Sequence, residues 1–189
     1  MEILQLSPAI ANRRSLRAYD PSRSVSQEHL DLLFEAARWA PSAFNEQPWR
    51  FVYAHRGDEA FDRLLSCLAP SNALWARNAS VLLLVIGKKN SSHNGNYNRH
   101  YSHDVGLAMG LLSVQATELG LNLHQMGGYD APKVEELFQI PDEFETISIT
   151  SVGYAGNPDG LPETLQVKET APRSRKSIDE IAFENHFRV

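Results

Sequence analysis

An unbroken aliphatic run at residues 81–86, Val-Leu-Leu-Leu-Val-Ile, restricts the fold of this 189-residue chain more than any other feature. Six residues are far too few to span a bilayer, which requires about 20. In a half-buried strand, apolar and polar residues alternate, whereas this run is apolar on both of its faces. It therefore predicts a central strand that is fully buried.

Helical and strand patterns alternate along the rest of the chain. Apolar residues at 30, 33, 34 and 37 recur at helical spacing, and those at 61, 64, 65 and 68 repeat the pattern in a helix that we expect Pro70 to close. Residues 49, 51 and 53 alternate as in a half-buried strand. Further along, we expect a helix from Asp104 to Gly120, a strand that contains Leu121 and Leu123 and precedes Gly127, a short helix after Asp130 and a last strand at 144–152. Because no regular βαβ repeat emerges, the pattern favours an α+β fold over a doubly wound sheet.

Composition limits the class of protein. The chain has 18 basic and 23 acidic residues, and this net charge of −5 argues against nucleic acid or an anionic membrane as the main partner. Its single cysteine, Cys67, permits no disulfide within the chain and lies on an apolar stretch, which indicates a core residue. The first residues show neither the basic region nor the long apolar stretch of a signal peptide. We therefore expect a cytoplasmic protein.

Two polar segments near the N-terminus give the first indication of a ligand. Arg13-Arg14-Ser15-Leu16-Arg17 brings together three guanidinium groups, which match the oxygens of a phosphate, and a hydroxyl. Residues 41–49, Pro-Ser-Ala-Phe-Asn-Glu-Gln-Pro-Trp, form a loop whose hydroxyl and amide groups can bond to the edge of a flat heterocycle. Each segment alone is also compatible with a solvated basic turn or an ordinary loop. Together they indicate a phosphorylated aromatic cofactor.

Four further segments follow in a characteristic order. Residues 104–106 (Asp-Val-Gly), 120–121 (Gly-Leu), 126–130 (Met-Gly-Gly-Tyr-Asp) and 173–176 (Arg-Ser-Arg-Lys) complete a set of motifs that covers nearly the whole chain. This set resembles the FMN-dependent nitroreductase family. The resemblance implies a three-layer α+β fold, in which a central mixed or antiparallel sheet is flanked by helices.

The resemblance also implies a chemistry. NADH or NADPH would pass hydride through FMN to a nitro compound, a quinone or a similar conjugated acceptor. Because the cofactor carries the reaction, no side chain is expected to act as a catalytic acid or base, and none to bind a metal. The loop at 88–103 lacks the helical insertion of longer relatives, so the acceptor stays open.

Family positions carry over to this sequence residue by residue. The resemblance assigns Arg13 and Ser15 to the FMN phosphate, and Arg17 to the N1 and C2 edge of the flavin. Arg14 would contribute its backbone and leave its side chain in solvent. The other predicted cofactor-binding residues are Arg173 and Arg175 of the late basic pair, Pro41, Ser42, Asn45 and Gln47 of the other subunit's loop, Gly127 and Gly128 near the flavin N5, and Asn72. Asn72 as a simple turn residue is nearly as good an interpretation, and some relatives carry a glutamate where this chain has Gly127.

The last part of the chain differs in composition from the rest. Prolines break it, and its apolar residues are sparse before Ile178, so it cannot bury enough surface to order itself. The resemblance implies an interwound homodimer with its active sites at the subunit interface. We therefore expect an FMN-binding core at 1–155 and a C-terminal extension at 156–189 that packs on the partner and supplies phosphate-binding arginines. Gly106 and Gly110 of the predicted helix would suit close packing in such a dimer.

Alternative functions stay open beside this one. A flavin-binding protein without turnover would carry the same motifs. A metal-dependent hydrolase would use His93, His100 and His103, although zinc sites usually show firmer spacing. The sequence lacks the G-x-G-x-x-G, P-loop and G-x-S-x-G motifs. We interpret Trp75 as a packing residue, and His124 as either a structural histidine or a neighbour of the flavin.

Overall fold

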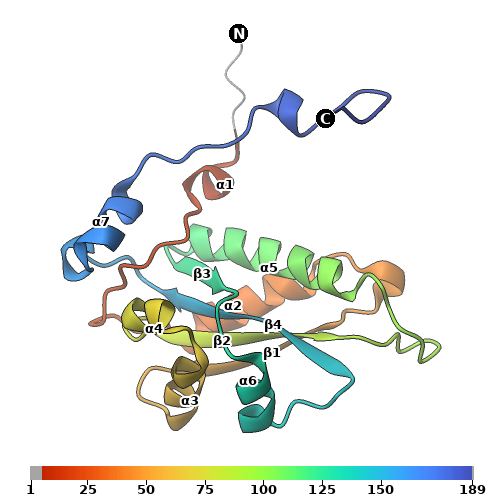
Figure 1. Cartoon of the computed structure of the whole chain (residues 1–189), viewed down its shortest axis with the longest axis horizontal. Helices are drawn as coiled ribbons and strands as arrows, with labels where there is room; N and C mark the ends of the chain where they lie inside the picture. Colours follow the sequence, from red (N-terminus) through yellow and green to blue (C-terminus); the bar gives the residue numbers. More distant parts are fainter. Residues whose placement is uncertain (1–5, 189) are drawn as a thin grey trace.

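The computed structural model describes residues 6–188 and places a four-stranded sheet at the centre of the molecule (Figure 1). Its strands lie in the order β1-β2-β4-β3, and every neighbouring pair is antiparallel. The strands are β1 (Trp49–His55), β2 (Val81–Lys88), β3 (Asn122–Met126) and β4 (Phe144–Gly153). The sheet is therefore antiparallel, and the predicted α+β class is confirmed.

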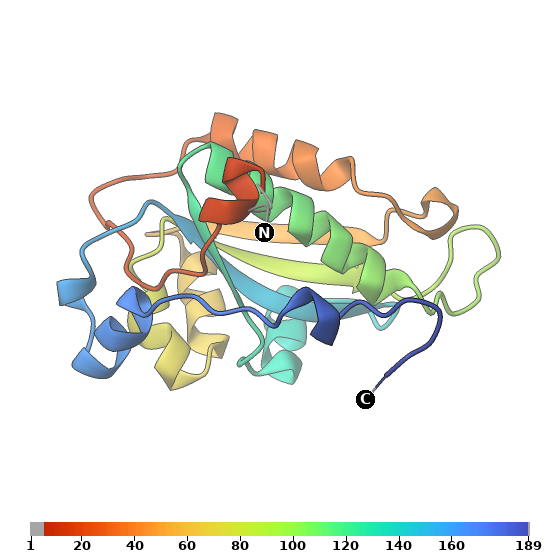
Figure 2. The ribbon, with the colours of Figure 1, turned by 90° about the horizontal axis from the view of Figure 1, so that it is seen from above.

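Helices cover both faces of this sheet (Figures 1 and 2). One face carries α2 (Gln27–Arg38) and α5 (Tyr101–Glu118), and the other carries α3 (Glu59–Cys67), α4 (Pro70–Ala76) and α6 (Ala131–Phe138). The short helix α1 (Pro8–Asn12) packs beside α5. The remaining elements are α7 (Glu163–Thr170) and the 3-10 turns η1 (Ala43–Asn45), η2 (Pro158–Gly160) and η3 (Ile178–Glu180). In the part of the chain that the structure describes, no helix is long and apolar enough to cross a membrane.

Strand β2 is the buried centre that the aliphatic run predicted. Leu82 and Leu84 belong to the core on the side of α3, α4 and α6. Leu83 and Val85 belong to the core on the side of α2 and α5. Complete burial of such a side chain contributes about 1.5–3 kcal/mol, so both faces of this strand favour its place in the middle layer.

Capping residues set several helix boundaries as predicted. The Ser26 hydroxyl accepts a hydrogen bond from the His29 amide at the start of α2. Asp130 caps α6 in the same way, through the Lys133 amide. Gly120 ends α5 with a φ of +69°, which a glycine adopts without strain.

One predicted boundary is wrong, and one helix was not predicted. Helix α5 begins at Tyr101, three residues before Asp104, whose carboxylate is buried and bonds outside its own helix. Helix α3 ends at Cys67, before Pro70 as expected, but Pro70 also begins α4, because a proline at the first helical position needs no hydrogen-bond partner for its nitrogen. Asn72 therefore lies in the first turn of a helix and not in a simple turn.

The segment after β4 returns to the N-terminal part of the same chain. The Gly156 amide donates to the Ala18 carbonyl at 2.9 Å, and α7 packs beside residues 14–18. Beyond Ala171 the segment is largely extended and exposed, and it runs across the molecule away from α7 (Figure 2). Its apolar side chains Ile178, Ile181 and Phe187 lie in solvent.

Candidate functional site

Arg13, Arg173 and Arg175 meet beside α1. They line one cavity of about 520 Å³ together with Leu6, Ile10 and Ala11. Burial lowers the pKa of Arg13, and the positive charges of Arg175 and Arg173 lower it further. None of the three guanidinium groups has a carboxylate within 4.0 Å among residues 6–188. This arginine cluster therefore has the charge and the donors that a phosphate group requires.

Two of these arginines also make contacts within the protein. Arg173 donates to the carbonyls of Arg13 at 2.8 Å and Ala11 at 2.5 Å, which joins positions 160 and 162 residues apart. Arg13 donates to the hydroxyl of Ser15 at 3.3 Å. A guanidinium has five N–H donors, so both side chains keep donors for a ligand. The structure thus brings together four residues that the resemblance assigned to one phosphate.

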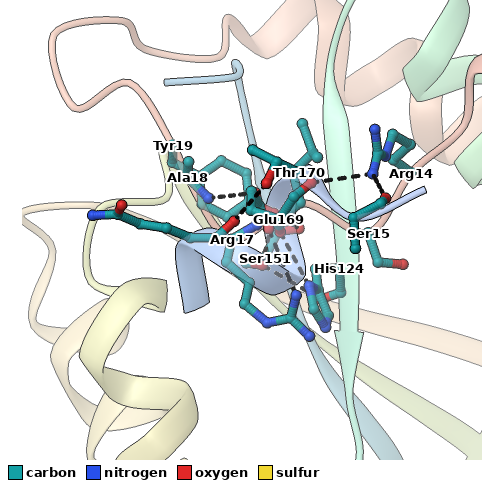
Figure 3. A network of polar contacts seen from close by, with 12 residues as sticks. Arg14, Ser15, Arg17, Ala18, Tyr19, His124, Ser151, Glu169 and Thr170 are labelled. Carbon is teal, nitrogen blue, oxygen red and sulfur yellow. Dashed lines mark hydrogen bonds and ion pairs between the residues drawn. The ribbon is translucent and has the colours of Figure 1, made fainter. Parts of the chain in front are cut away.

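A buried carboxylate from α7 holds the backbone of the N-terminal motif (Figure 3). Glu169 is 6% exposed, and its Oε1 accepts hydrogen bonds from the amides of Arg17 at 2.6 Å and Ala18 at 2.9 Å. Its Oε2 lies 3.6 Å from Nη1 of Arg17. The sequence analysis missed this residue, because Glu169 is one of 23 acidic residues and no local pattern distinguishes it.

The side chain of Arg14, in the N-terminal motif, binds the backbone of α7. Its Nη2 donates to the carbonyls of Glu169 and Ala171, at 3.1 Å each. These carbonyls lie at the C-terminal end of α7, where the last turn leaves acceptors unpaired and favours a cation. The expectation that the Arg14 side chain lies free in solvent is therefore wrong.

His124 anchors the same motif to β3. Its Nδ1 lies 3.0 Å from the carbonyl oxygen of Leu16, and a carbonyl only accepts, so Nδ1 carries the proton. Its ring packs on Trp75, with 4.7 Å between the ring centroids. Burial lowers the pKa of His124 and favours the neutral ring. Of the two interpretations offered above, the contacts fit a structural histidine, and Trp75 is a packing residue as predicted.

The turn after β3 lies against Asn72. Nδ2 of Asn72 donates to the Gly128 carbonyl at 3.2 Å, and a Cβ on Gly128 would lie 3.1 Å from that nitrogen. A Cβ on Gly127 would meet nothing within 4 Å, so the backbone there is open to close approach. The structure brings these three predicted residues together.

The loop at 41–48 is held in an unusual backbone conformation. Phe44, Asn45 and Gln47 have φ values of 52°, 56° and 48°, a region that residues other than glycine rarely adopt. The Ser42 hydroxyl accepts from the Gln47 amide at 3.0 Å, and Nε2 of Gln47 donates to the Asn45 carbonyl at 3.2 Å. Such strain accumulates at functional sites. Phe44, which the sequence analysis did not single out, is 95% exposed between Ser42 and Asn45.

Glu46 connects this loop to the next one. Its carboxylate accepts hydrogen bonds from the Ser91 hydroxyl and from the amides of Ser92, at 2.7 Å, and His93, at 3.3 Å. These bonds, that of Ser91 first, lower the pKa of Glu46 to about 2. A cavity of about 200 Å³ lies between the loops, and Phe44 and Tyr97 are among its lining residues.

The loop histidines line two cavities: His93 and His100 share one, and His100 and His103 share the other. His93 and His100 line the 200 Å³ cavity, whereas Nδ1 of His103 lies 3.2 Å from the carboxylate of Asp104. Within residues 6–188, no group of three or more His, Cys, Asp or Glu side chains could hold a metal ion. Cys67 is buried in the core, as predicted.

The predicted site residues fall into two groups at opposite ends of α5. The carboxylate of Asp104, in the first turn of α5, accepts from the Ala43 amide at 3.0 Å, and Pro41 and Ser42 line a hollow beside that turn. The arginine motif instead contacts β3, the strand that follows the other end of α5. An 18-residue helix is about 27 Å long, so the loop and the arginine motif lie toward different ends of it.

Comparisons with known proteins show which family has the same sequence pattern. The pattern of the nitroreductase family matches residues 10–74 and 65–154. A relative from Archaeoglobus fulgidus, whose name gives NADH dehydrogenase/NAD(P)H nitroreductase, is 30% identical over 149 residues, which are 77% of this chain and 82% of the relative.

Solved structures extend the likeness to the whole fold. An oxidoreductase containing FMN has a TM-score of 0.93 at 37% identity, over 100% of this chain and 96% of that protein. A protein of Desulfovibrio desulfuricans solved in complex with FMN has a TM-score of 0.76 at 25% identity, over 97% of this chain and 100% of that protein. These neighbours agree with the predicted three-layer fold, cofactor and class of enzyme. The chain belongs to the nitroreductase family, as its motifs predicted.

Proposed function

We propose that this chain is an FMN-dependent oxidoreductase that takes hydride from NADH or NADPH and delivers it to a nitro compound, a quinone or a similar conjugated acceptor. FMN, when bound, would supply the two-electron chemistry. The side chains of the protein would bind the cofactor, orient it and set the charge around it.

The arginine cluster is the observation that carries this proposal. A phosphate monoester has a charge of about −1.5 to −2 at neutral pH, which one arginine cannot balance. Arg13, Arg173 and Arg175 surround one cavity, and no carboxylate of residues 6–188 neutralises them. Burial lowers the pKa of Arg13, the charges of Arg175 and Arg173 lower it further, and an anion would relieve their repulsion. The residues present therefore fit the phosphate group of FMN.

Other residues would hold the ring. Arg17 follows directly on the phosphate-binding part of the motif, and a cation at the N1 and C2 edge stabilises the negative charge that a flavin gains on reduction. Gly127 offers an open backbone, and Asn72 fixes the position of Gly128. We propose that these residues contact FMN together with Ser42, Asn45 and Gln47 of a second subunit.

The second subunit is part of the proposal because of the distance along α5. The exposed face of α5 carries Gly106, Leu107, Gly110 and Leu111, and a Cβ on either glycine would meet nothing within 4 Å. A second α5 can approach such a stripe of small and apolar residues closely. A two-fold dimer through this stripe would bring the loop of one subunit to the arginines of the other twice.

The C-terminal extension has two parts in this proposal. Residues 156–171 pack on their own chain through Gly156 and Glu169, so this part supports the arginine motif within one subunit. Residues beyond Ala171 present Ile178, Ile181 and Phe187 to solvent, and we propose that they pack on the partner. We keep the division into a core at 1–155 and an extension at 156–189, and propose that only the part of the extension beyond Ala171 packs on the partner.

A spectroscopic titration tests the proposal. The purified protein should be yellow or should bind added FMN at about one equivalent per chain. NADH or NADPH should bleach the bound flavin, and a quinone should restore its colour. A colourless protein that ignores FMN would overturn the proposal, and flavin binding without reduction by either nucleotide would identify a non-catalytic flavin-binding protein.

A further inference from the structure

We propose that Glu169 is a positioning residue that sets the electrostatic effect of Arg17 on the flavin. It anchors the backbone at Arg17 and offsets part of the guanidinium charge, so bound FMN has a lower reduction potential than Arg17 alone would give it. This inference depends on the FMN site proposed above.

The carboxylate of Glu169 makes two kinds of contact, one with each oxygen. Oε1 accepts from the backbone amides of Arg17 and Ala18, at 2.6 and 2.9 Å, and so fixes where the chain turns away from the arginine motif. Oε2 lies 3.6 Å from Nη1 of Arg17 and pairs with its charge. Figure 3 shows both contacts beside His124 and Tyr19. The first contact positions Arg17, and the second reduces its field.

Burial makes this charge effective over a short distance. The Glu169 side chain is 3% exposed and the Arg17 side chain 27% exposed, so water screens the carboxylate little. Both charges already act on a neighbouring group. Burial is the main cause of the lowered pKa of His124, but Arg17 lowers that pKa further and Glu169 raises it. At a flavin edge beside Arg17, the negative charge of Glu169 would likewise offset part of the positive charge of Arg17.

Further hydrogen bonds hold the segment that carries Glu169 against the N-terminal motif. Arg14 holds the carbonyls of Glu169 and Ala171, so the end of α7 that carries the carboxylate is fixed to the motif it serves. Gly156 fixes the start of the extension to Ala18. The C-terminal extension therefore places a negative charge beside a cation that has a role in redox chemistry.

The Glu169→Gln variant separates the two contributions. The glutamine oxygen can still accept from the amides of Arg17 and Ala18, but the negative charge is gone. We expect the equilibrium constant for two-electron reduction of bound FMN to rise about tenfold, which corresponds to about 30 mV. The affinity for FMN should change by less than about threefold, because the backbone anchor is retained. Potentials are measured by equilibration with a reference dye during reduction.

Two further variants complete the design. Arg17→Ala should shift the potential in the opposite direction, downward. Glu180→Gln is the matched control, since that carboxylate lies in the same extension but bonds to Ser177 at the surface. It should leave the potential unchanged.

A measurement on FMN-free protein covers variants that load poorly. Hydrogen exchange at the Arg17 and Ala18 amides should be slow in the wild type and in Glu169→Gln, and faster in Glu169→Ala. An unchanged potential in FMN-loaded Glu169→Gln overturns the electrostatic role, and equal exchange in all three proteins overturns the positioning role. Failure of the wild type to bind FMN is a different result, which counts against the proposed function itself.

Discussion

Arg175→Ala should weaken FMN binding without weakening the fold. Among the described residues, Arg175 donates only to the carbonyl of its neighbour Ser174, at 2.7 Å, and its charge repels that of Arg13. Removing it therefore relieves repulsion in the FMN-free protein, whose Tm should stay the same or rise slightly. A hydrogen bond to a charged group contributes about 1.5–3 kcal/mol. Because Arg175 is exposed, we take the lower value of about 1.5 kcal/mol, which is about a tenfold increase in Kd for FMN.

Arg173→Ala gives the contrasting result. Its guanidinium holds the carbonyls of Ala11 and Arg13, so the truncation removes intramolecular bonds as well as a phosphate contact. We expect a similar loss of FMN affinity together with a lower Tm of the FMN-free protein. The pair of variants separates binding from stability within one cluster.

Titrations with FMN and with riboflavin provide the decisive assay. Riboflavin has the same ring system but no phosphate, so Arg175→Ala should leave its Kd unchanged. Flavin fluorescence reports both titrations, and rising salt should reduce the difference between wild type and variant for FMN alone. An equal loss of affinity for both ligands would refute the assignment of this cluster to the phosphate.

Three other predictions follow from separate features of the fold. Gly156→Ala should destabilise the protein by about 3 kcal/mol in a denaturant titration, since a Cβ there collides with the backbone of Tyr19; Gly160→Ala, where a Cβ meets nothing within 4 Å, should not. Burial lowers the pKa of His124 below 6.5, so the unfolded chain takes up a proton first as the pH falls, and stability present above pH 6.5 is lost below it. His124→Asn, which keeps a donor for the Leu16 carbonyl, should therefore lose less Tm between pH 7 and pH 5 than the wild type, and an equal loss would contradict this. Refolding an Arg13→Ala/Arg175→Ala chain together with a Ser42→Ala/Asn45→Ala chain should restore FMN binding in about a quarter of all sites, because random pairing gives half heterodimers with one intact site each; binding no better than the average of the parents would place the whole site in one chain.

Local patterns were sufficient to predict most of the fold. The run at 81–86 is buried on both faces because its residues alternate between the two cores. Ser26, Gly120 and Asp130 act at the helix ends where their chemistry placed them. The sequence predicted that α5 starts at Asp104, because aspartate is a common N-cap residue. In the structure the Asp104 carboxylate instead accepts a hydrogen bond from the Ala43 amide of another loop.

Only those residues of the candidate site that belong to a recognisable sequence motif could be predicted. Arg13, Ser15, Arg173 and Arg175 carried such a motif, and the structure brings them together. Glu169 and Arg14 contact each other's segments across about 150 residues of sequence. Phe44 stands out only by its positive φ, which the sequence does not reveal. A tertiary contact between one glutamate and two amides leaves no signal in a single sequence.

Two structural features are the basis for proposing a site that is shared between two subunits. One is the contact between the N-terminal and C-terminal segments, and the other is the length of α5. Arg173 and Glu169 join the C-terminal extension to the N-terminal motif, so contacts within one chain hold the proposed phosphate half of the site together. Asp104, in the first turn of α5, holds the loop that carries Ser42 and Asn45, about 21 Å along that helix from its last residue Glu118. In the proposed site a cofactor that bridges both halves contacts two subunits, and a ligand bound only by the dimer stabilises the dimer by mass action. The proposed two-subunit site therefore predicts that loading with FMN and association of subunits are one linked equilibrium.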